Sequence, residues 1–207
     1  MSNLRVALLG SLILSGCSPA SEDSDSVEAN GSVAVDVAAT EVNEPAETDA
    51  PPAVAQATSN FTKLDMAQCR IVEENKEEGP YWLRRCSGHA GWQLDWSESD
   101  LRQGLTLISP GGQQTELRLS DRVAKGAFNS LGTTVEWRGA DAAKPEALIV
   151  RMNVASGAEP TRPDISRLAV VRLTGTPCLA AVIQPGPGQN EKARGIADGA
   201  MADCVDG

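Results

Sequence analysis

Short runs in which apolar and polar residues alternate recur through the last two thirds of the chain, and they limit its fold more than any other feature. The clearest are ALIVRMNV at 147–154 and RLAVVRLT at 167–174. Successive side chains of a strand point to opposite faces of a sheet, so a period of two predicts strands with one buried face. Similar runs predict further strands at 69–75, 81–86, 91–97, 104–108, 115–119, 134–138 and 178–184.

One helix is expected near the C-terminus. The sequence PGPG at 185–188 ends the last predicted strand, and Asn190 is placed to cap a helix over 191–203. Gly195 and Gly199 weaken this helix. The predicted fold class is therefore mainly β: an antiparallel sheet, either a sandwich or a partly closed barrel, with one C-terminal helix packed on it.

The N-terminus has the pattern of a signal peptide. Residues 1–16 begin with a short positive stretch ending at Arg5, and a mostly apolar run of nine residues follows at 6–14. A membrane-spanning helix needs about 20 apolar residues, so this run is too short for a permanent anchor. The run leads into LSGC at 14–17, which resembles the lipobox of bacterial lipoproteins.

This resemblance implies a lipid on Cys17. In bacterial lipoproteins the cysteine thiol receives a diacylglycerol, signal peptidase II cuts before the cysteine, and the new amine is usually acylated too, for example with palmitate. Two or three acyl chains hold a protein stably at a membrane, whereas one chain is marginal. Ser18, in place of Asp, points to the periplasmic face of the outer membrane where the source is Gram-negative; inner or outer membrane stays open.

A tether is predicted between this anchor and the strands. Residues 18–60 contain nine acidic residues, no basic residue and no aromatic residue. Such a segment buries too little apolar surface to offset its conformational entropy, so we expect it to be disordered. The predicted organisation is a signal peptide at 1–16, a lipidated cysteine and acidic tether at 17–60, and a disulfide-stapled β-rich domain at 61–207.

Charge and composition exclude one class of partner. The formal net charge of the whole chain is −10, and aromatic residues make up only 3% of it. Nucleic-acid binding needs a basic face, and base stacking needs aromatic side chains, so we expect no nucleic acid as a partner.

The cysteines of the predicted domain indicate disulfides. There are four of them, namely Cys69, Cys86, Cys178 and Cys204. An even number in an exported chain is typical of disulfides, and four cysteines allow three pairings. The chain has no C-x-x-C motif, so a zinc or thiol site is less favoured. We predict no metal and no cofactor.

Strand pairing favours one of the three disulfide arrangements. The strands at 69–75 and 81–86 flank a turn, and directly opposed residues of an antiparallel pair are close enough for a disulfide. Such a hairpin pairs Cys69 with Cys86, Ile71 with Arg84 and Glu73 with Trp82. The second disulfide would then join Cys178 to Cys204.

Few residues have the pattern of a catalytic site, and we assign none. His89 is the one histidine of the sequence, so any Ser-His-Asp site would have to use it. Ser87 lies only two residues away, which is a poor geometry for a nucleophile and its base. The acidic cluster of Asp95, Glu98 and Asp100 has carboxylates that calcium prefers, but it is better interpreted as a solvated turn.

The tryptophans are the best candidates for ligand contact. Trp82, Trp92, Trp96 and Trp137 each fall on an alternating strand, where core packing is the usual role, but a sugar-stacking surface is the alternative. We take Trp82, Trp92, Trp96 and His89 as candidate binding residues.

Two function classes follow. The first is a membrane-anchored envelope lipoprotein that displays a non-catalytic binding domain in the periplasm, with an unknown envelope protein or peptidoglycan as its partner. The second is an envelope hydrolase or a protein similar to lysozyme inhibitors; that comparison rests on architecture alone.

Overall fold

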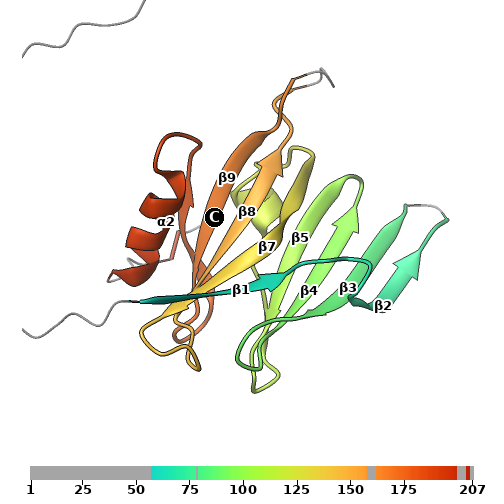
Figure 1. The fold of residues 1–207 in the computed structure, drawn as a ribbon. Coiled ribbons are helices and arrows are strands. Elements are labelled where there is room, and N and C mark those ends of the chain that lie inside the picture. Colours follow the sequence, from blue (N-terminus) through green and yellow to red (C-terminus); the bar gives the residue numbers. More distant parts are fainter. Residues whose placement is uncertain (1–56, 78, 158–161, 200–203, 206–207) are drawn as a thin grey trace, which may run out of the picture. The chain divides into compact units, whose positions relative to one another are not determined.

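The computed structural model describes residues 57–77, 79–157, 162–199 and 204–205. The signal peptide, Cys17 and nearly all of the predicted tether lie outside these residues. The described part contains ten strands and two helices, shown in Figure 1. Neither of these helices has the length and apolar character needed to cross a membrane.

The element bounds are β1 (Thr58–Lys63), β2 (Arg70–Asn75), β3 (Tyr81–Ser87), β4 (Gln93–Ser99), β5 (Arg102–Ile108), β6 (Gln114–Glu116), α1 (Leu119–Arg122), β7 (Asn129–Gly139), β8 (Ala147–Val154), β9 (Ile165–Arg172), β10 (Cys178–Ile183) and α2 (Gln189–Asp198).

All ten strands belong to one mostly antiparallel sheet, as the sequence predicted in its coarse form. The strand order is β10-β9-β8-β7-β5-β4-β3-β2, with β1 paired to β7 and β6 paired to β5. The ten strands thus form a single sheet, and α2 packs on one of its faces (Figure 1). The sheet has two antiparallel halves, which meet at one parallel pairing, between Arg102 of β5 and Asn129 of β7.

The first strand, β1, was not predicted. It begins at Thr58, so the proposed boundary between tether and domain at residue 60 falls inside a strand. β1 pairs with β7 over its whole length, from Thr58 opposite Gly139 to Lys63 opposite Thr134. The segment TSNFTK contains a single large apolar residue, Phe61, so its pattern gave no period-two signal.

The hairpin of β2 and β3 has the predicted partners at one end only. Ile71 lies opposite Arg84, as expected, but a bulge between Ile71 and Glu73 adds one residue to β2. The predicted pairing of Glu73 with Trp82 is therefore wrong, and Glu74 takes that position.

Several other boundaries differ from the predictions, and the largest difference in a strand is that β7 runs from Asn129 to Gly139 instead of 134–138. The helix expected over 191–203 is α2, which begins two residues earlier and ends at Asp198; predicted residues 200–203 lie outside the described residues. The strand expected at 115–119 ends at Glu116, because Arg118 adopts a left-handed conformation (φ 50°) and Leu119 begins α1. Helix α2 is capped by Gly188, not by Asn190, and the Asn190 Oδ1 accepts a hydrogen bond of 2.8 Å from Arg151 instead.

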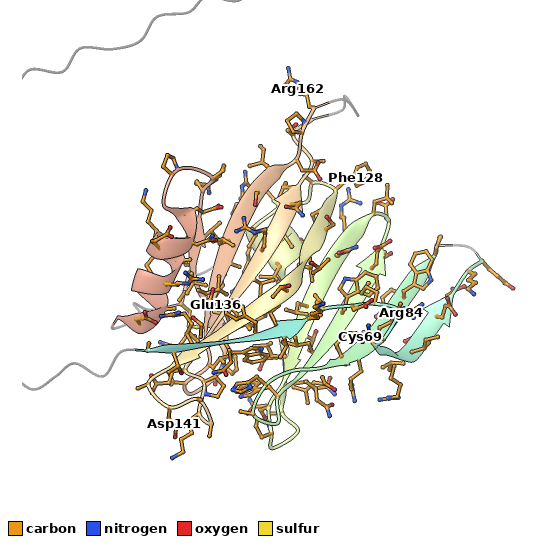
Figure 2. The ribbon with its side chains drawn as sticks, in the orientation of Figure 1. Cys69, Arg84, Phe128, Glu136, Asp141 and Arg162 are labelled. Atoms are coloured by element: carbon orange, nitrogen blue, oxygen red, sulfur yellow. A yellow bond between two sulfur atoms is a disulfide. The ribbon has the colours of Figure 1, made fainter. Side chains whose placement is uncertain are left out.

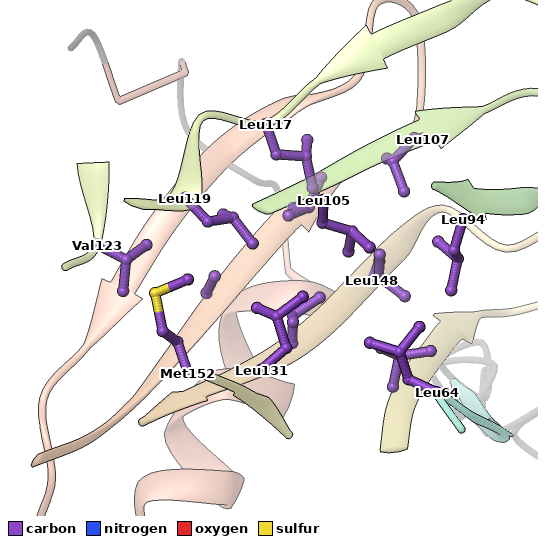
Figure 3. Packing of buried hydrophobic residues seen from close by; sticks show 14 of the residues in the cluster. Leu64, Leu94, Leu105, Leu107, Leu117, Leu119, Val123, Leu131, Leu148 and Met152 are labelled. Atoms are coloured by element: carbon purple, nitrogen blue, oxygen red, sulfur yellow. The ribbon is translucent and has the colours of Figure 1, made fainter. Parts of the chain in front are cut away.

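The core lies on both faces of the sheet. On one face, buried apolar side chains of both halves pack with α1 (Figure 3); the labelled members are Leu64, Leu94, Leu105, Leu107, Leu117, Leu119, Val123, Leu131, Leu148 and Met152. On the other face, Ala193 and Ala197 of α2 pack against Ile149, Leu168 and Val170. Helix α2 thus covers β8 and β9.

Both disulfides have the favoured pairing. Cys69 is joined to Cys86, and Cys178 is joined to Cys204. The second disulfide lies beside a main-chain hydrogen bond of 2.7 Å from Val205 to Leu179, so the described end of the chain is held against β10. The first disulfide holds the connection between β1 and β2 against β3.

A network of charged side chains ties α2 to β7 and β1. Arg138 makes two hydrogen bonds, of 2.6 and 2.5 Å, to the carboxylate of Asp198 and one of 2.9 Å to Glu136. Glu136 also accepts hydrogen bonds from Arg194 of α2 at 2.8 Å and from the Ser59 hydroxyl of β1 at 2.7 Å. Burial alone would raise the pKa of Glu136, but the hydrogen bonds from Arg194, Ser59 and Arg138 outweigh it and hold that pKa below its ordinary value.

We predict that Glu136→Gln lowers the free energy of unfolding at neutral pH by about 2 kcal/mol, because it leaves the buried guanidinium of Arg138 with one carboxylate fewer. A carboxyl whose pKa is lowered by folding contributes stability above its unfolded pKa, and the contribution is lost as the pH falls toward the folded value. Urea unfolding at a series of pH values should therefore show that the difference in free energy of unfolding between wild type and variant becomes smaller as the pH falls.

The control is Asp121→Asn, which removes an exposed ion pair with Arg118. Such pairs contribute about 0–1 kcal/mol, so its effect should be small at every pH. A constant gap between wild type and Glu136→Gln across the pH range would contradict the assigned role of Glu136.

Trp137 is the largest fully buried side chain, and the loop after β3 packs on it. Its Nε1 donates a hydrogen bond of 2.9 Å to the hydroxyl of Thr62. A Cβ added at Gly88 would lie 2.9 Å from the Trp137 ring and 2.7 Å from the main-chain oxygen of Trp92. Both distances are shorter than real contacts allow, so this position has room only for glycine.

We predict that Gly88→Ala destabilises the domain by about 1–3 kcal/mol, since the Trp137 ring or the loop must move. Gly111→Ala is the matched control, because a Cβ there would lie an ordinary 3.7 Å from Ser109 Oγ. Thermal unfolding of the two variants measures the difference. Equal melting temperatures would show that the loop yields without cost.

Candidate binding site

The four candidate binding residues separate into two places. Trp82 and Trp96 line one pocket together. His89 and Trp92 lie instead against Trp137, with ring centroids 6.4 and 6.3 Å from that of Trp137. The candidate residues therefore form two groups, and the group of Trp82 and Trp96 borders a hollow of the surface.

His89 is held by a main-chain contact. Its Nε2 lies 2.5 Å from the carbonyl oxygen of Ala142. A carbonyl oxygen only accepts hydrogen bonds, so Nε2 carries the hydrogen and donates it. This nitrogen is therefore engaged and does not serve as a base in the described arrangement. Together with the ring contact to Trp137, this hydrogen bond ties the loop after β3 to the loop between β7 and β8.

The pocket is built by the register of β3 and β4. Trp82 lies opposite Glu98, and Arg84 lies opposite Trp96. The period of two places all four side chains on one face of the sheet. The connection between β1 and β2 crosses this face and adds the last two lining residues. The pocket, called here the Trp82–Trp96 pocket, has a volume of about 280 Å³ and is lined by Met66, Ala67, Trp82, Arg84, Trp96 and Glu98.

The two indoles have different roles in this pocket. Trp96 is only 5% exposed, so it forms part of the floor and offers little open ring face. Trp82 is half-buried and forms a wall. The Trp82 Nε1 donates a hydrogen bond of 3.2 Å to the Oε1 of Glu74, which fixes the direction of the ring. The bulge in β2 matters here, because it places Glu74 opposite Trp82.

The charged groups of the pocket are also held in place. The guanidinium of Arg84 donates to the main-chain oxygen of Met66 at 3.3 Å. The Oε2 of Glu98 accepts a hydrogen bond of 2.6 Å from the amide of Gln103 on β5. Gln103 is fixed in turn, because its Oε1 accepts a hydrogen bond of 2.7 Å from the main-chain nitrogen of Leu131 on β7. The position of the Glu98 carboxylate thus depends on three strands.

A second hollow adjoins the first at Glu98. It has a volume of about 270 Å³, and we call it the Phe128 hollow; its lining consists of Glu98, Leu101, Gln103, Phe128, Asn129, Ser130, Ala155 and Asp164. Leu101 is 62% exposed and Phe128 is 46% exposed. The Arg102 guanidinium lies over the Phe128 ring, 4.8 Å from its centroid. Figure 2 labels Arg84, which lines the first hollow, and Phe128, which lines the second.

The opposite face of β3 to β5 carries a polar hollow of about 420 Å³. Next to it, Arg85 makes a two-pronged ion pair with the buried Asp95, with both contacts at 2.6 Å. Burial raises the pKa of Tyr81, and the nearby carboxylates of Glu73, Asp95 and Glu116 add to that effect. The ion pair of Arg85 and Asp95 neutralises the buried carboxylate of Asp95, and both of its charged groups are used in that pair.

The structure separates the acidic cluster of the sequence. Asp95 pairs with Arg85 on one face, Glu98 faces the Trp82–Trp96 pocket on the other, and Asp100 pairs with Arg102 in the turn. No group of three or more His, Cys, Asp or Glu residues that could hold a metal ion occurs within the described ranges.

Sequence reasoning missed several residues of this joined surface. Arg84 and Glu98 share the strand faces of Trp82 and Trp96, so the alternation already contained the signal for them. Met66 and Phe128 lie in connections between strands, and no local pattern predicts where such connections cross a sheet.

Comparisons of this chain with protein-family models, with curated proteins and with solved structures find no match. The chemistry of the residues that line the two hollows therefore carries the functional assignment.

Proposed function

We propose that this chain is a lipoprotein of the bacterial cell envelope, attached to a membrane through a lipid on Cys17. Its β-rich domain binds an envelope protein or cell-wall material, without catalysis, at the Trp82–Trp96 pocket. The signal peptide and the LSGC sequence at 14–17 support the anchor. The two disulfides are consistent with an oxidising compartment such as the periplasm.

The observation that carries the binding role is the chemistry of the pocket. It combines an indole wall, an indole floor, a guanidinium and a carboxylate around an open hollow of about 280 Å³. Ligand sites typically pair a mainly apolar lining with a few placed polar groups. The charged groups of this pocket are oriented by Met66 and Gln103, so they are organised before any ligand arrives.

The alternative function, a hydrolase, has weaker support. A carboxylate-dependent glycosidase needs two carboxyl groups facing one space. Among the described residues that line the Trp82–Trp96 pocket, Glu98 is the one acid, although the adjoining Phe128 hollow is lined by Asp164 as well as Glu98. His89 lies beyond the far end of β3 with its Nε2 engaged by Ala142. Binding is therefore the function that this geometry favours.

The anchor predicts a change of location on substitution. Cys17→Ala removes the thiol that would carry the lipid, so the chain should move from the membrane fraction to the soluble fraction and lose labelling by radioactive palmitate. Wild type should be released by detergent and not by high salt, since acyl chains hold it. Membrane association of Cys17→Ala equal to that of wild type would contradict a lipid anchor.

The binding site predicts loss of a partner on substitution of Trp82. We expect crosslinking of the full lipidated chain in intact cells to capture an envelope protein, or the chain to sediment with peptidoglycan. Trp82→Ala should lose most of that capture, because it removes the wall of the pocket. Phe61→Ala is the control, since Phe61 is an aromatic residue with an exposed ring and lies on β1, outside the pocket.

Equal capture by wild type, Trp82→Ala and Phe61→Ala would show that the pocket is not the binding site. A lysozyme assay with the purified full chain separates the alternatives, because slower lysis indicates an inhibitor and lysis without lysozyme indicates a hydrolase.

A further inference from the structure

We infer that the Trp82–Trp96 pocket and the Phe128 hollow together take an extended, basic peptide segment of a partner protein. In this segment a lysine or arginine lies between two apolar residues. One apolar side chain enters the Trp82–Trp96 pocket, the cation meets Glu98, and the second apolar side chain packs on Leu101 and Phe128. The inference rests on the proposed binding role and names its ligand class.

The two hollows form one surface because Glu98 lines both. Each end of this surface is apolar: Met66 and Trp82 lie at one end, and the exposed Leu101 and Phe128 lie at the other. Its middle is a carboxylate. The order along the sheet is therefore apolar, acidic, apolar, which calls for a ligand with apolar, basic and apolar groups in the same order.

The charge of the surface favours a cation. The Oε2 of Glu98 is engaged by Gln103, while its Oε1 has no hydrogen bond or ion pair among the described residues. Glu98 and Asp164 are the acids that line the two hollows, and Arg84 is the one cation among their described lining residues. Glu74, which holds Trp82, is already paired with Lys76 at 3.2 Å.

The two guanidinium groups near this surface are already engaged. Arg84 donates to the main-chain oxygen of Met66 in the first hollow. Arg102, at the second hollow, is paired with Asp100 and donates to the Gly126 carbonyl at 2.8 Å. A ligand ammonium would therefore make a charge-assisted hydrogen bond to the open Oε1 of Glu98.

The spacing agrees with an extended peptide. The surface crosses from β3 through β4 and β5 to the start of β7, which is three strand spacings of about 4.8 Å, or about 14 Å. In an extended peptide, residues four apart are separated by about 13 Å, and the first, third and fifth side chains share a face. The pattern apolar-x-Lys-x-apolar thus spans the surface.

The ring faces argue against a sugar as the ligand. Sugar stacking needs an open aromatic face, but Trp96 is 5% exposed. The Phe128 ring has the Arg102 guanidinium over it. Of the aromatic rings that line this surface, Trp82 is then the one with a face open for stacking. Aliphatic side chains of a peptide do not need an open ring face, because they pack equally well against the edge of an aromatic ring.

The test measures binding of blocked synthetic peptides to the full chain purified in detergent. One fluorescent peptide has the pattern Leu-Ser-Lys-Ser-Leu between flanking serines, and the second has glutamate in place of lysine. We expect the lysine peptide to bind the wild-type chain more tightly than the glutamate peptide by about fivefold or more. A glycan probe, soluble peptidoglycan fragments, is measured beside them.

Glu98→Gln should remove most of this preference, because it keeps the size and the amide contact to Gln103 but removes the charge. Glu116→Gln is the matched control: Glu116 is exposed and lies at the hollow of the opposite face, so the preference should persist. Glu98→Lys should reverse the preference toward the glutamate peptide, a result that a folding defect would not produce.

The failures of the two proposals are distinguishable. Equal binding of both peptides, or an unchanged preference in Glu98→Gln, overturns the inference of a basic segment. Binding of the peptidoglycan fragments alone, still abolished by Trp82→Ala, overturns it too but leaves the proposed binding site in place. If Trp82→Ala changes neither peptide nor glycan binding, the site itself is wrong.

Discussion

The junction between β5 and β7 is the point on which the described domain depends. The two halves of the sheet share one parallel pairing there, so ladder hydrogen bonds contribute little to joining them. Side chains do so instead: Asn129 accepts a hydrogen bond of 3.0 Å from the main-chain nitrogen of Gln103, and Gln103 accepts one from Leu131. Because Gln103 also holds Glu98, the same junction that unites the sheet orients the carboxylate of the candidate site.

The connection from β1 to β2 is the second link between the halves. The chain pairs with β7 along β1 and reaches β3 through the Cys69–Cys86 disulfide. On the way Leu64 is buried in the core, and Met66 is placed at the Trp82–Trp96 pocket. The disulfide and the core contact together fix the ends of this crossing segment, so the wall of the pocket formed by Met66 is tied to the stability of the fold.

The sequence predicted nine of the ten described strands and the Cys69–Cys86 disulfide, because these follow from a period of two within single strands and one hairpin. The Cys178–Cys204 disulfide then followed as the remaining pair. The sequence did not predict the bulge in β2, since one added residue leaves the local pattern of RIVEEN unchanged. β1 and the junction at Asn129 were also missed. Both depend on pairing between segments that lie far apart in the chain. Alternation of apolar and polar residues can predict that a segment is a strand, but it does not predict which other strand it pairs with.

The outer edge of the sheet at β2 explains why a partner would bind a face and not an edge. Within the described ranges β2 pairs only with β3, and its six residues are all exposed, including Ile71 and Val72. An unpaired edge of this kind invites strand addition, but bulges and charges oppose it. β2 has both, namely the irregularity at Val72 and the consecutive carboxylates of Glu73 and Glu74. Since Glu74 also holds Trp82, one feature of β2 both discourages pairing at the edge and organises the pocket on the adjoining face.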